Sequence, residues 1–246
     1  KFYFAEVEKK GGAVIGLLSE ILFEALSKFT WPRSMRWADN KIRWVRPIKS
    51  ILCLFNGSVV EFSFGPLTAG NTTSGHRLHS PKPFKVNNFT DYRKKLNKAS
   101  VILESKERRA IIEDEAKKLV KKLKLNLKND PDLLNEVTGL VEWPVTYIGR
   151  IDETFMDLPD EVLSTTMRKH QKYFSVTDSY GKLAPYFIVI ANAETLDLGK
   201  AIVAGNERVL RARLADAKFF WSQDLKKELS SRVQVLGERI FHAKLG

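Results

Sequence analysis

The stretch GNERVLRARLADAKFF, residues 205–220, carries the densest pattern in the sequence. Leu210 and Leu214 recur at helical spacing, so they share one face of a helix, and the charged residues fall beside that face. We predict one long helix from Asn206 onward, with a break near Gly237.

The charged residues beside the apolar face are spaced for ion pairs along the helix. Glu207 precedes Arg211 by four positions, and Arg213 precedes Asp216 by three. Helical side chains at these spacings are neighbours. The stretch is therefore either an ordinary ion-paired surface helix or a positively charged ridge whose arginines, including Arg208, contact RNA.

Outside this stretch, weaker patterns predict the other elements. Helices are predicted over residues 16–29, 105–125, 131–139 and 159–169. Two hairpins are predicted, with turns at Asn56-Gly57 and at residues 178–181, and a strand over residues 141–151. Residues 65–90, rich in Gly, Pro, Thr and Asn, are interpreted as a long connection. Helices and hairpins alternate irregularly, so the predicted fold class is α+β, with mixed sheets and hairpins packed with helices.

We divide the chain into three regions on these patterns. Residues 1–90 form an N-terminal α+β region that contains the Asn-Gly hairpin. Residues 91–204 form a mixed α/β domain, and residues 205–246 a C-terminal helical segment.

Basic residues dominate the charge, and the 246 residues carry a formal net charge of +12. A charge this large favours polyanionic partners, and nucleic acid fits better than a membrane because no apolar run is long enough to span one. Residues 33–49 hold six basic residues against Asp39, and tryptophans interleave with them. Arg36 and Arg46 are the phosphate-binding candidates, while Trp37 and Trp44 are either stacking platforms for bases or core residues.

Lysines dominate a second basic stretch. Residues 93–128 hold thirteen basic residues against five acidic ones. The lysine cluster of residues 117–124 lies opposite an apolar stripe, as expected of an ordinary solvent-exposed helix. If this face touches RNA, it steers and positions the RNA without reading its sequence.

Two histidine motifs are candidates for binding or chemistry. His76 and His79 enclose Arg77 on a predicted turn, which suits a phosphate-contacting loop better than a four-ligand zinc site. His170 and Lys172 stand just before a predicted strand and are further RNA-binding candidates.

Several function classes find no support in the sequence. The single cysteine, Cys53, provides no disulfide framework and fits a reducing, cytoplasmic compartment. Neither the Walker nor the dinucleotide glycine motif occurs, and no recognisable synthetase catalytic signature is present. We therefore expect no catalytic residue, no metal and no cofactor in this chain.

Ordered blocks give the sequence a specific resemblance. The 205–220 stretch closely resembles the signature of the β subunit of bacterial two-subunit glycyl-tRNA synthetase. Further blocks follow in the family's order: Met35-Arg36-Trp37, Arg46-Pro47, residues 75–79, 136–138, 141–145, 170–174 and 181–185. Leu78 departs from the family's phenylalanine. The region 91–204 is also similar to a domain in the tRNA-binding subunit of the phenylalanyl enzyme.

The resemblance implies an α2β2 enzyme that joins glycine to its tRNA with ATP. It places the chain inside the N-terminal half of the β subunit, without that subunit's HD-like and anticodon-binding domains. The implied partners are the α subunit, which would bind ATP and Mg²⁺, and the glycine tRNA. The chain would then be the tRNA-recognition and assembly region, the alternatives being a protein-binding scaffold or a vestigial editing-like domain.

Overall fold

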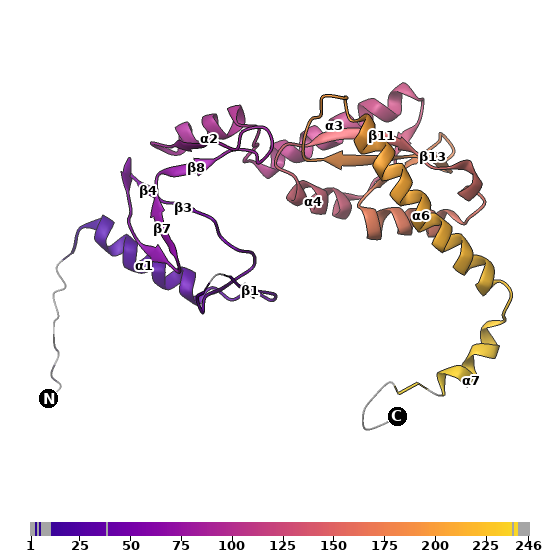
Figure 1. Ribbon diagram of the computed structural model, residues 1–246, viewed down its shortest axis with the longest axis horizontal. Coiled ribbons are helices and arrows are strands. Elements are labelled where there is room, and N and C mark those ends of the chain that lie inside the picture. Colours follow the sequence, from indigo (N-terminus) through magenta and orange to yellow (C-terminus); the bar gives the residue numbers. More distant parts are fainter. Residues whose placement is uncertain (1–2, 4, 6–10, 38, 238, 241–246) are drawn as a thin grey trace. The chain divides into compact units, whose positions relative to one another are not determined.

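The computed structural model describes residues 3, 5, 11–37, 39–237 and 239–240 (Figure 1). The contacts divide the chain into a first unit, residues 1–103, and a second unit, residues 104–246. The first unit combines helices with several small sheets and the second combines helices with one four-stranded sheet, which confirms the α+β class. The contacts assign residues 89–98 to the first unit, and residues 200–224 pack against residues 145–150 in the second. The three regions bounded at 90 and 204 stay a prediction.

The first unit combines two helices with short strands. Its elements are α1 (Val14–Lys28), β1 (Met35–Arg36), β2 (Arg43–Trp44), β3 (Ile51–Leu52), β4 (Leu54–Phe55), β5 (Ser58–Val59), β6 (Ser63–Phe64), β7 (Leu67–Gly70), β8 (Thr72–Ser74), β9 (Pro83–Lys85) and α2 (Phe89–Lys98). Strand β7 lies between β3, which is parallel to it, and β6, which is antiparallel. The pairs β1–β2, β4–β5 and β8–β9 form separate antiparallel ladders.

The Asn-Gly hairpin is confirmed, although its ladder is short. Asn56 and Gly57 have φ values of 49° and 82°, as a tight two-residue turn requires. The strands on either side of the hairpin, β3 before β4 and β6 after β5, both pair with β7 and do not extend the hairpin. The interpretation of residues 65–90 as one long connection is wrong, because β7, β8 and β9 lie within them.

An aromatic cluster packs at the end of α1. The ring of Trp44 lies 5.1 Å from Trp31, 5.8 Å from Phe29 and 5.6 Å from the buried Phe64. Such tilted and edge-to-face pairs are favourable arrangements of aromatic rings. Trp44 is therefore a packing residue of the first unit.

The second unit is built around a four-stranded antiparallel sheet, in the order β10-β12-β13-β11. Its elements are α3 (Ser105–Lys122), β10 (Asn126–Leu127), α4 (Pro131–Leu140), β11 (Val145–Arg150), η1 (Glu153–Phe155), α5 (Asp160–Thr166), η2 (Met167–Gln171), β12 (Phe174–Thr177), β13 (Leu183–Ala191), α6 (Lys200–Asp224), η3 (Leu229–Arg232) and α7 (Val233–Leu236). The helices predicted over 105–125, 131–139 and 159–169 correspond to α3, α4 and α5 with η2.

Each face of this sheet has its own core. On one face, Ile188 of β13 packs with residues of α3 and α4. On the other, Phe187 packs with Leu210 and Leu214 of α6 and with Leu163 of α5. Successive residues of a strand point to opposite faces, so β13 contributes to both cores.

Helix α6 differs from its prediction at both ends. It begins at Lys200, where the carboxylate of Asp197 accepts the backbone N–H of Ala201 at 2.7 Å, and it ends at Asp224. The helical run is first interrupted between Asp224 and η3, and α7 ends at Leu236, beside the break predicted near Gly237.

Candidate nucleic-acid interface

Helix α6 carries the three arginines predicted to bind RNA. Leu210 faces the core, and Arg208 and Arg213 are exposed on other sides of the helix. Nε of Arg211 lies 3.2 Å from Oδ2 of Asp152. Arg208 and Arg213 are therefore open to solvent, whereas Arg211 has a partner in its own unit.

The ion pairs predicted along α6 are wrong. Glu207 accepts the backbone N–H of Arg150 at 2.8 Å, at the outer edge of the sheet. Arg211 turns to another segment instead of to Glu207, and among the described residues no ion pair joins Arg213 to Asp216. For Glu207 and Arg211, contacts with distant segments replace the predicted local pair.

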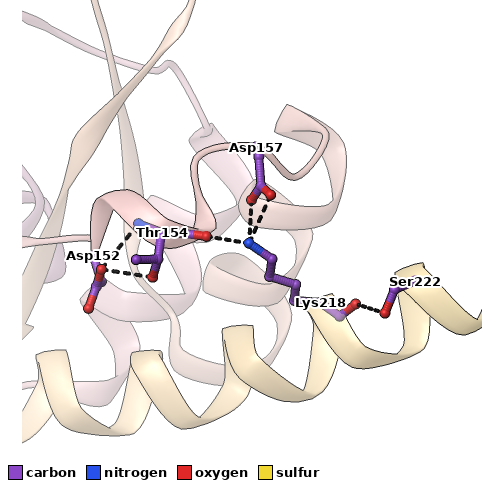
Figure 2. A network of polar contacts seen from close by, with 5 residues as sticks. All are labelled: Asp152, Thr154, Asp157, Lys218 and Ser222. Carbon is purple, nitrogen blue, oxygen red and sulfur yellow. Dashed lines mark hydrogen bonds and ion pairs between the residues drawn. The ribbon is translucent and has the colours of Figure 1, made fainter.

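A polar network fixes the η1 segment to α6 (Figure 2). Nζ of Lys218 donates to the backbone carbonyl of Thr154 at 2.5 Å and to both carboxylate oxygens of Asp157 at 2.9 and 2.8 Å. The hydrogen bond from Lys218 lowers the pKa of Asp157. Hydrogen bonds from Thr154, followed by the charge of Arg211, lower the pKa of Asp152. Lys218 and Arg211 therefore connect α6 to the η1 region of the same unit.

The segment η2 presents the predicted His170. Helix α5 widens here into a π-helical turn, and Lys172 follows in the left-handed conformation with φ of 60°. Single π turns are rare and occur often at functional sites. His170 is exposed, and Lys172 is half-buried with its Nζ 2.8 Å from Oε1 of Glu136.

A second ion pair joins η2 to α4. Nε of Arg168 lies 2.6 Å from Oδ2 of Asp130, whose Oδ1 accepts the backbone N–H of Leu133 at 3.0 Å. Burial opposes ionisation of Asp130, but the hydrogen bonds from Arg168 and Leu133 outweigh it and lower its pKa. The side chains of Lys169 and His170 are exposed and form no hydrogen bond or ion pair with the described residues. The candidates named from the sequence did not include Arg168 and Lys169. The run Arg168-Lys169-His170 could have indicated them.

The first unit holds the other predicted residues. Arg36 of β1 and Arg43 of β2 face each other across the ladder, and both are exposed. Arg46 is exposed as well. Trp44 belongs to the aromatic cluster and Trp37 is half-buried with its indole nitrogen covered, so the core interpretation applies to Trp44.

In the turn that contains His76 and Arg77, the buried side chain of His76 holds the backbone in place. His76 is 2% exposed, and its Nδ1 accepts the backbone N–H groups of Leu78 and His79 at 3.3 Å each. Its own backbone N–H donates to the carbonyl of Ala99 at 2.9 Å. Arg77 is exposed beside it. Within the described ranges no group of three potential metal ligands occurs.

The predicted residues therefore fall into two sets. Arg36, Arg46, His76 and Arg77 belong to the first unit, and the remaining five to the second. In the second unit, the hydroxyl of Tyr173, next to Lys172, donates to Oδ1 of Asn206 at 2.5 Å. This bond ties the end of η2 to the flank of α6 on which Arg213 lies two turns further along.

A cavity near these residues had no signal in the sequence. Its volume is about 560 Å³, and residues of α3, β10 and the start of α4 line it. Its rim contains lysines that the sequence analysis assigned to an ordinary solvent-exposed helix face.

Comparison with known sequences shows which family the chain belongs to. The model of a family described as glycyl-tRNA synthetase beta subunit matches residues 1–246. The chain belongs to the glycyl-tRNA synthetase beta subunit family.

Individual relatives agree with this assignment. The glycine–tRNA ligase beta subunit of Rhodospirillum centenum is 49% identical over 269 residues, covering 100% of this chain and 38% of the relative. That of Rickettsia akari is 44% identical over 245 residues, covering 100% of this chain and 37% of the relative. That of Ruegeria sp. is 46% identical over 253 residues, covering 99% and 37%. The chain thus spans 37–38% of the length of these relatives.

The blocks that resemble the glycyl-tRNA synthetase beta subunit occupy distinct places in the structure. Residues 205–220 form the middle of α6, residues 170–174 cover the end of η2 and the start of β12, and residues 75–79 form the His76 turn. In the part of the chain that the structure describes, no helix combines the length and apolarity needed to cross a membrane.

Proposed function

We propose that this chain is the tRNA-contacting and assembly region of a glycyl-tRNA synthetase beta subunit. In this role it supports the ATP-dependent attachment of glycine to tRNA by the α subunit. One observation carries the proposal beyond family membership: two ion pairs anchor η2 while Lys169 and His170 remain exposed on it.

The anchoring matters because it reduces the cost of ordering the basic side chains. Arg168 and Lys172 hold the backbone of η2 against α4 through Asp130 and Glu136. Lys169, which lies between them, is then positioned before RNA arrives, so less conformational freedom is lost on binding. Charge-assisted contacts to phosphate are the stronger class of hydrogen bond.

Helix α6 extends the proposed contact. Arg208 and Arg213 are exposed there and have no ion-pair partner among the described residues. Phosphate contacts of this kind position RNA without reading its sequence, and they weaken as salt rises. We assign sequence discrimination to other parts of the enzyme, and ATP and Mg²⁺ to the α subunit.

Filter binding of glycine tRNA at several salt concentrations tests the proposal. The test variant combines Lys169→Glu with Arg208→Glu, and the control combines Lys226→Glu with Lys227→Glu, which are also exposed in the second unit. Both doubles lower the net charge by the same amount. We expect the test variant to bind about thirtyfold more weakly at low salt, since each of the two lost contacts contributes on the order of 1 kcal/mol. Equal losses in the two doubles, or binding no stronger than that of an acidic protein, would refute the RNA contact.

The apolar surface of α1 favours a second function, as a scaffold for a protein partner. Val14, Leu17 and Ile21 share one face of α1 and are 53%, 48% and 57% exposed, and α1 buries none of its residues fully. Exposed apolar patches of this kind mark protein-binding surfaces. Co-purification with the α subunit tests this role, because Leu17→Asp with Ile21→Asp should release the α subunit and leave tRNA binding intact.

A further inference from the structure

The cavity of about 560 Å³ in the second unit has an apolar floor. Ile112 and Ala116 of α3, Leu134 of α4 and Phe174 of β12 contribute to it. These side chains belong to the core on that face of the sheet. The cavity is therefore an opening into a packed core, of the size range typical of small-molecule sites.

The rim of the cavity is basic. Lys117 forms an ion pair with Glu113 at 2.7 Å, whereas Lys121 and Lys128 are exposed and form no ion pair within the described ranges. The carboxylate of Asp130, also at the rim, is occupied by Arg168. Two ammonium groups that form no ion pair with the described residues thus border an apolar floor, an arrangement complementary to an anion that carries an apolar body.

The cavity also offers neutral hydrogen-bonding groups. Strand β10 is an outer strand, and the backbone N–H of Lys128 donates to Ser175 on β12 at 3.0 Å. Alternation along the strand turns the N–H and C=O of Leu127 to the open side. The exposed amide of Asn129 makes no hydrogen bond to the described residues. A fatty acid would leave these groups without partners, whereas the edge of a nucleobase supplies donors and acceptors.

The cavity continues toward the surface proposed to contact RNA. A smaller cavity of about 100 Å³ shares Lys128, Asn129 and Asp130 with it. This second cavity reaches Ser164 of α5 and Arg168 of η2. An RNA strand that passes η2 would therefore have a path to the large cavity.

We propose that the cavity holds one unstacked nucleotide of a bound RNA. The base lies on the apolar floor beside Phe174, its edge meets Asn129 and the backbone of Leu127, and its phosphate lies between Lys121 and Lys128. The proposal rests on the RNA contact proposed above and deepens it, because it assigns a site to a single nucleotide.

Titration of the ¹⁵N-labelled chain tests the site. The probes are 5′-AMP, ribose 5-phosphate and the single-stranded RNA (A)₅, followed through the backbone amides. We expect 5′-AMP and (A)₅ to shift the amides of residues 121 and 125–130. Ribose 5-phosphate should bind at least about fivefold more weakly, because the base supplies stacking and apolar contact.

Two charge-matched variants identify the lysines that matter. Lys121→Glu with Lys128→Glu should weaken (A)₅ binding about tenfold through the lost phosphate contacts. Lys122→Glu with Lys124→Glu alters exposed lysines of the same segment that do not line the cavity, and should weaken it less than about twofold. All four positions are exposed, and thermal melting verifies that both variants fold.

The outcomes separate this inference from the proposed function. Equal losses in the two variants, or shifts outside the cavity, overturn the nucleotide site while filter binding of tRNA stands. Binding of 5′-AMP without binding of (A)₅ overturns the assignment to RNA in favour of a free nucleotide. If (A)₅ occupies the cavity but Lys169→Glu with Arg208→Glu leaves tRNA binding unchanged, the nucleotide site stands and the η2 contact falls.

Discussion

Asp130 and Arg168 form a two-point ion pair, with 2.6 Å between Nε and Oδ2 and 3.3 Å between Nη2 and Oδ1. The same carboxylate caps α4 through the N–H of Leu133. One side chain therefore fixes both the start of a helix and the position of η2, the segment proposed to contact RNA.

Two substitutions of Asp130 separate the contribution of the ion pair to stability from that of the helix cap. Asp130→Asn keeps a capping oxygen and loses only the ion pair, so we expect a loss below about 1 kcal/mol at neutral pH. Asp130→Ala also loses the cap and should cost about 1–2 kcal/mol more. Because the folded-state pKa of Asp130 is lowered, its contribution is present at neutral pH and is lost as pH falls below about 4, through the folded pKa. Urea unfolding from pH 7 to pH 2.5 measures this, and an unchanged pH slope in Asp130→Asn would contradict it.

Arg208 and Arg211, three positions apart on α6, should respond differently to replacement by alanine. Arg208→Ala removes an exposed cation, so tRNA affinity should fall about fivefold and the salt slope by about one unit, without a change in melting temperature. Arg211→Ala breaks the contact with Asp152 and should slightly lower the free energy of unfolding, because exposed ion pairs contribute little to stability. Filter binding and thermal melting of both variants decide the matter; the reverse pattern would assign RNA contact to Arg211.

Gly149 leaves no room for a side chain. A Cβ there would overlap the ring of Phe187, its cross-strand partner, which is fully buried. Gly149→Ala should therefore destabilise the second unit by about 1–3 kcal/mol, and Phe187→Leu in the same chain should recover part of the loss. Gly139→Ala is the control: it meets no atom within 4 Å and lies in α4, so it should stabilise by about 0.5–1 kcal/mol. Additive effects at Gly149 and Phe187 would show that the overlap relaxes.

Tyr173 should make the second unit sensitive to alkali. Burial raises the pKa of its hydroxyl to about 12. The unfolded chain releases this proton near pH 10, so stability is intact below that pH and is lost as pH rises toward 12. Tyr173→Phe should remove this dependence and cost about 1 kcal/mol at neutral pH through the lost bond to Asn206. Fluorescence-monitored urea unfolding at pH 8 and pH 11 compares the two chains, and parallel losses would refute the assignment.

Two neighbouring faces of α1 should tolerate aspartate differently. Leu17→Asp with Ile21→Asp lies on the exposed face and should cost less than about 1 kcal/mol. Leu18→Asp with Leu22→Asp lies on the half-buried face and should cost several times more, because it places charges against apolar side chains. Circular dichroism melts of the two doubles test this, and equal costs would mean that both faces are packed.

Prediction from the sequence succeeded where a signal is local. The Asn56-Gly57 turn and the Asp130 cap need only neighbouring residues, and both were found. The parallel pairing of β3 with β7 was missed because strands of two and four residues are too short to show a periodicity. The start of α6 was placed six residues too late, since the capping Asp197 belongs to a turn outside the apolar pattern.

For the candidate site, the sequence indicated where basic residues are dense but not which of them are free. Arg211 and Lys218 are held by Asp152 and Asp157, about sixty positions earlier in the chain, and no helical spacing reveals such partners. His76 shows the same limit, because its burial depends on the backbone that surrounds it. The cavity beside β10 depends on how α3, β10, α4 and β12 pack, and no motif marks it.

The alternation along β13 has a consequence for how the second unit melts. Phe187 belongs to one core and Ile188 to the other, and both are fully buried. Neither helical layer can detach and leave the strand in a stable environment, so the two layers share one cooperative transition. Protection of amides against hydrogen exchange should then be nearly uniform across α3, α4 and the buried part of α6. An RNA-bound second unit would respond as one rigid body.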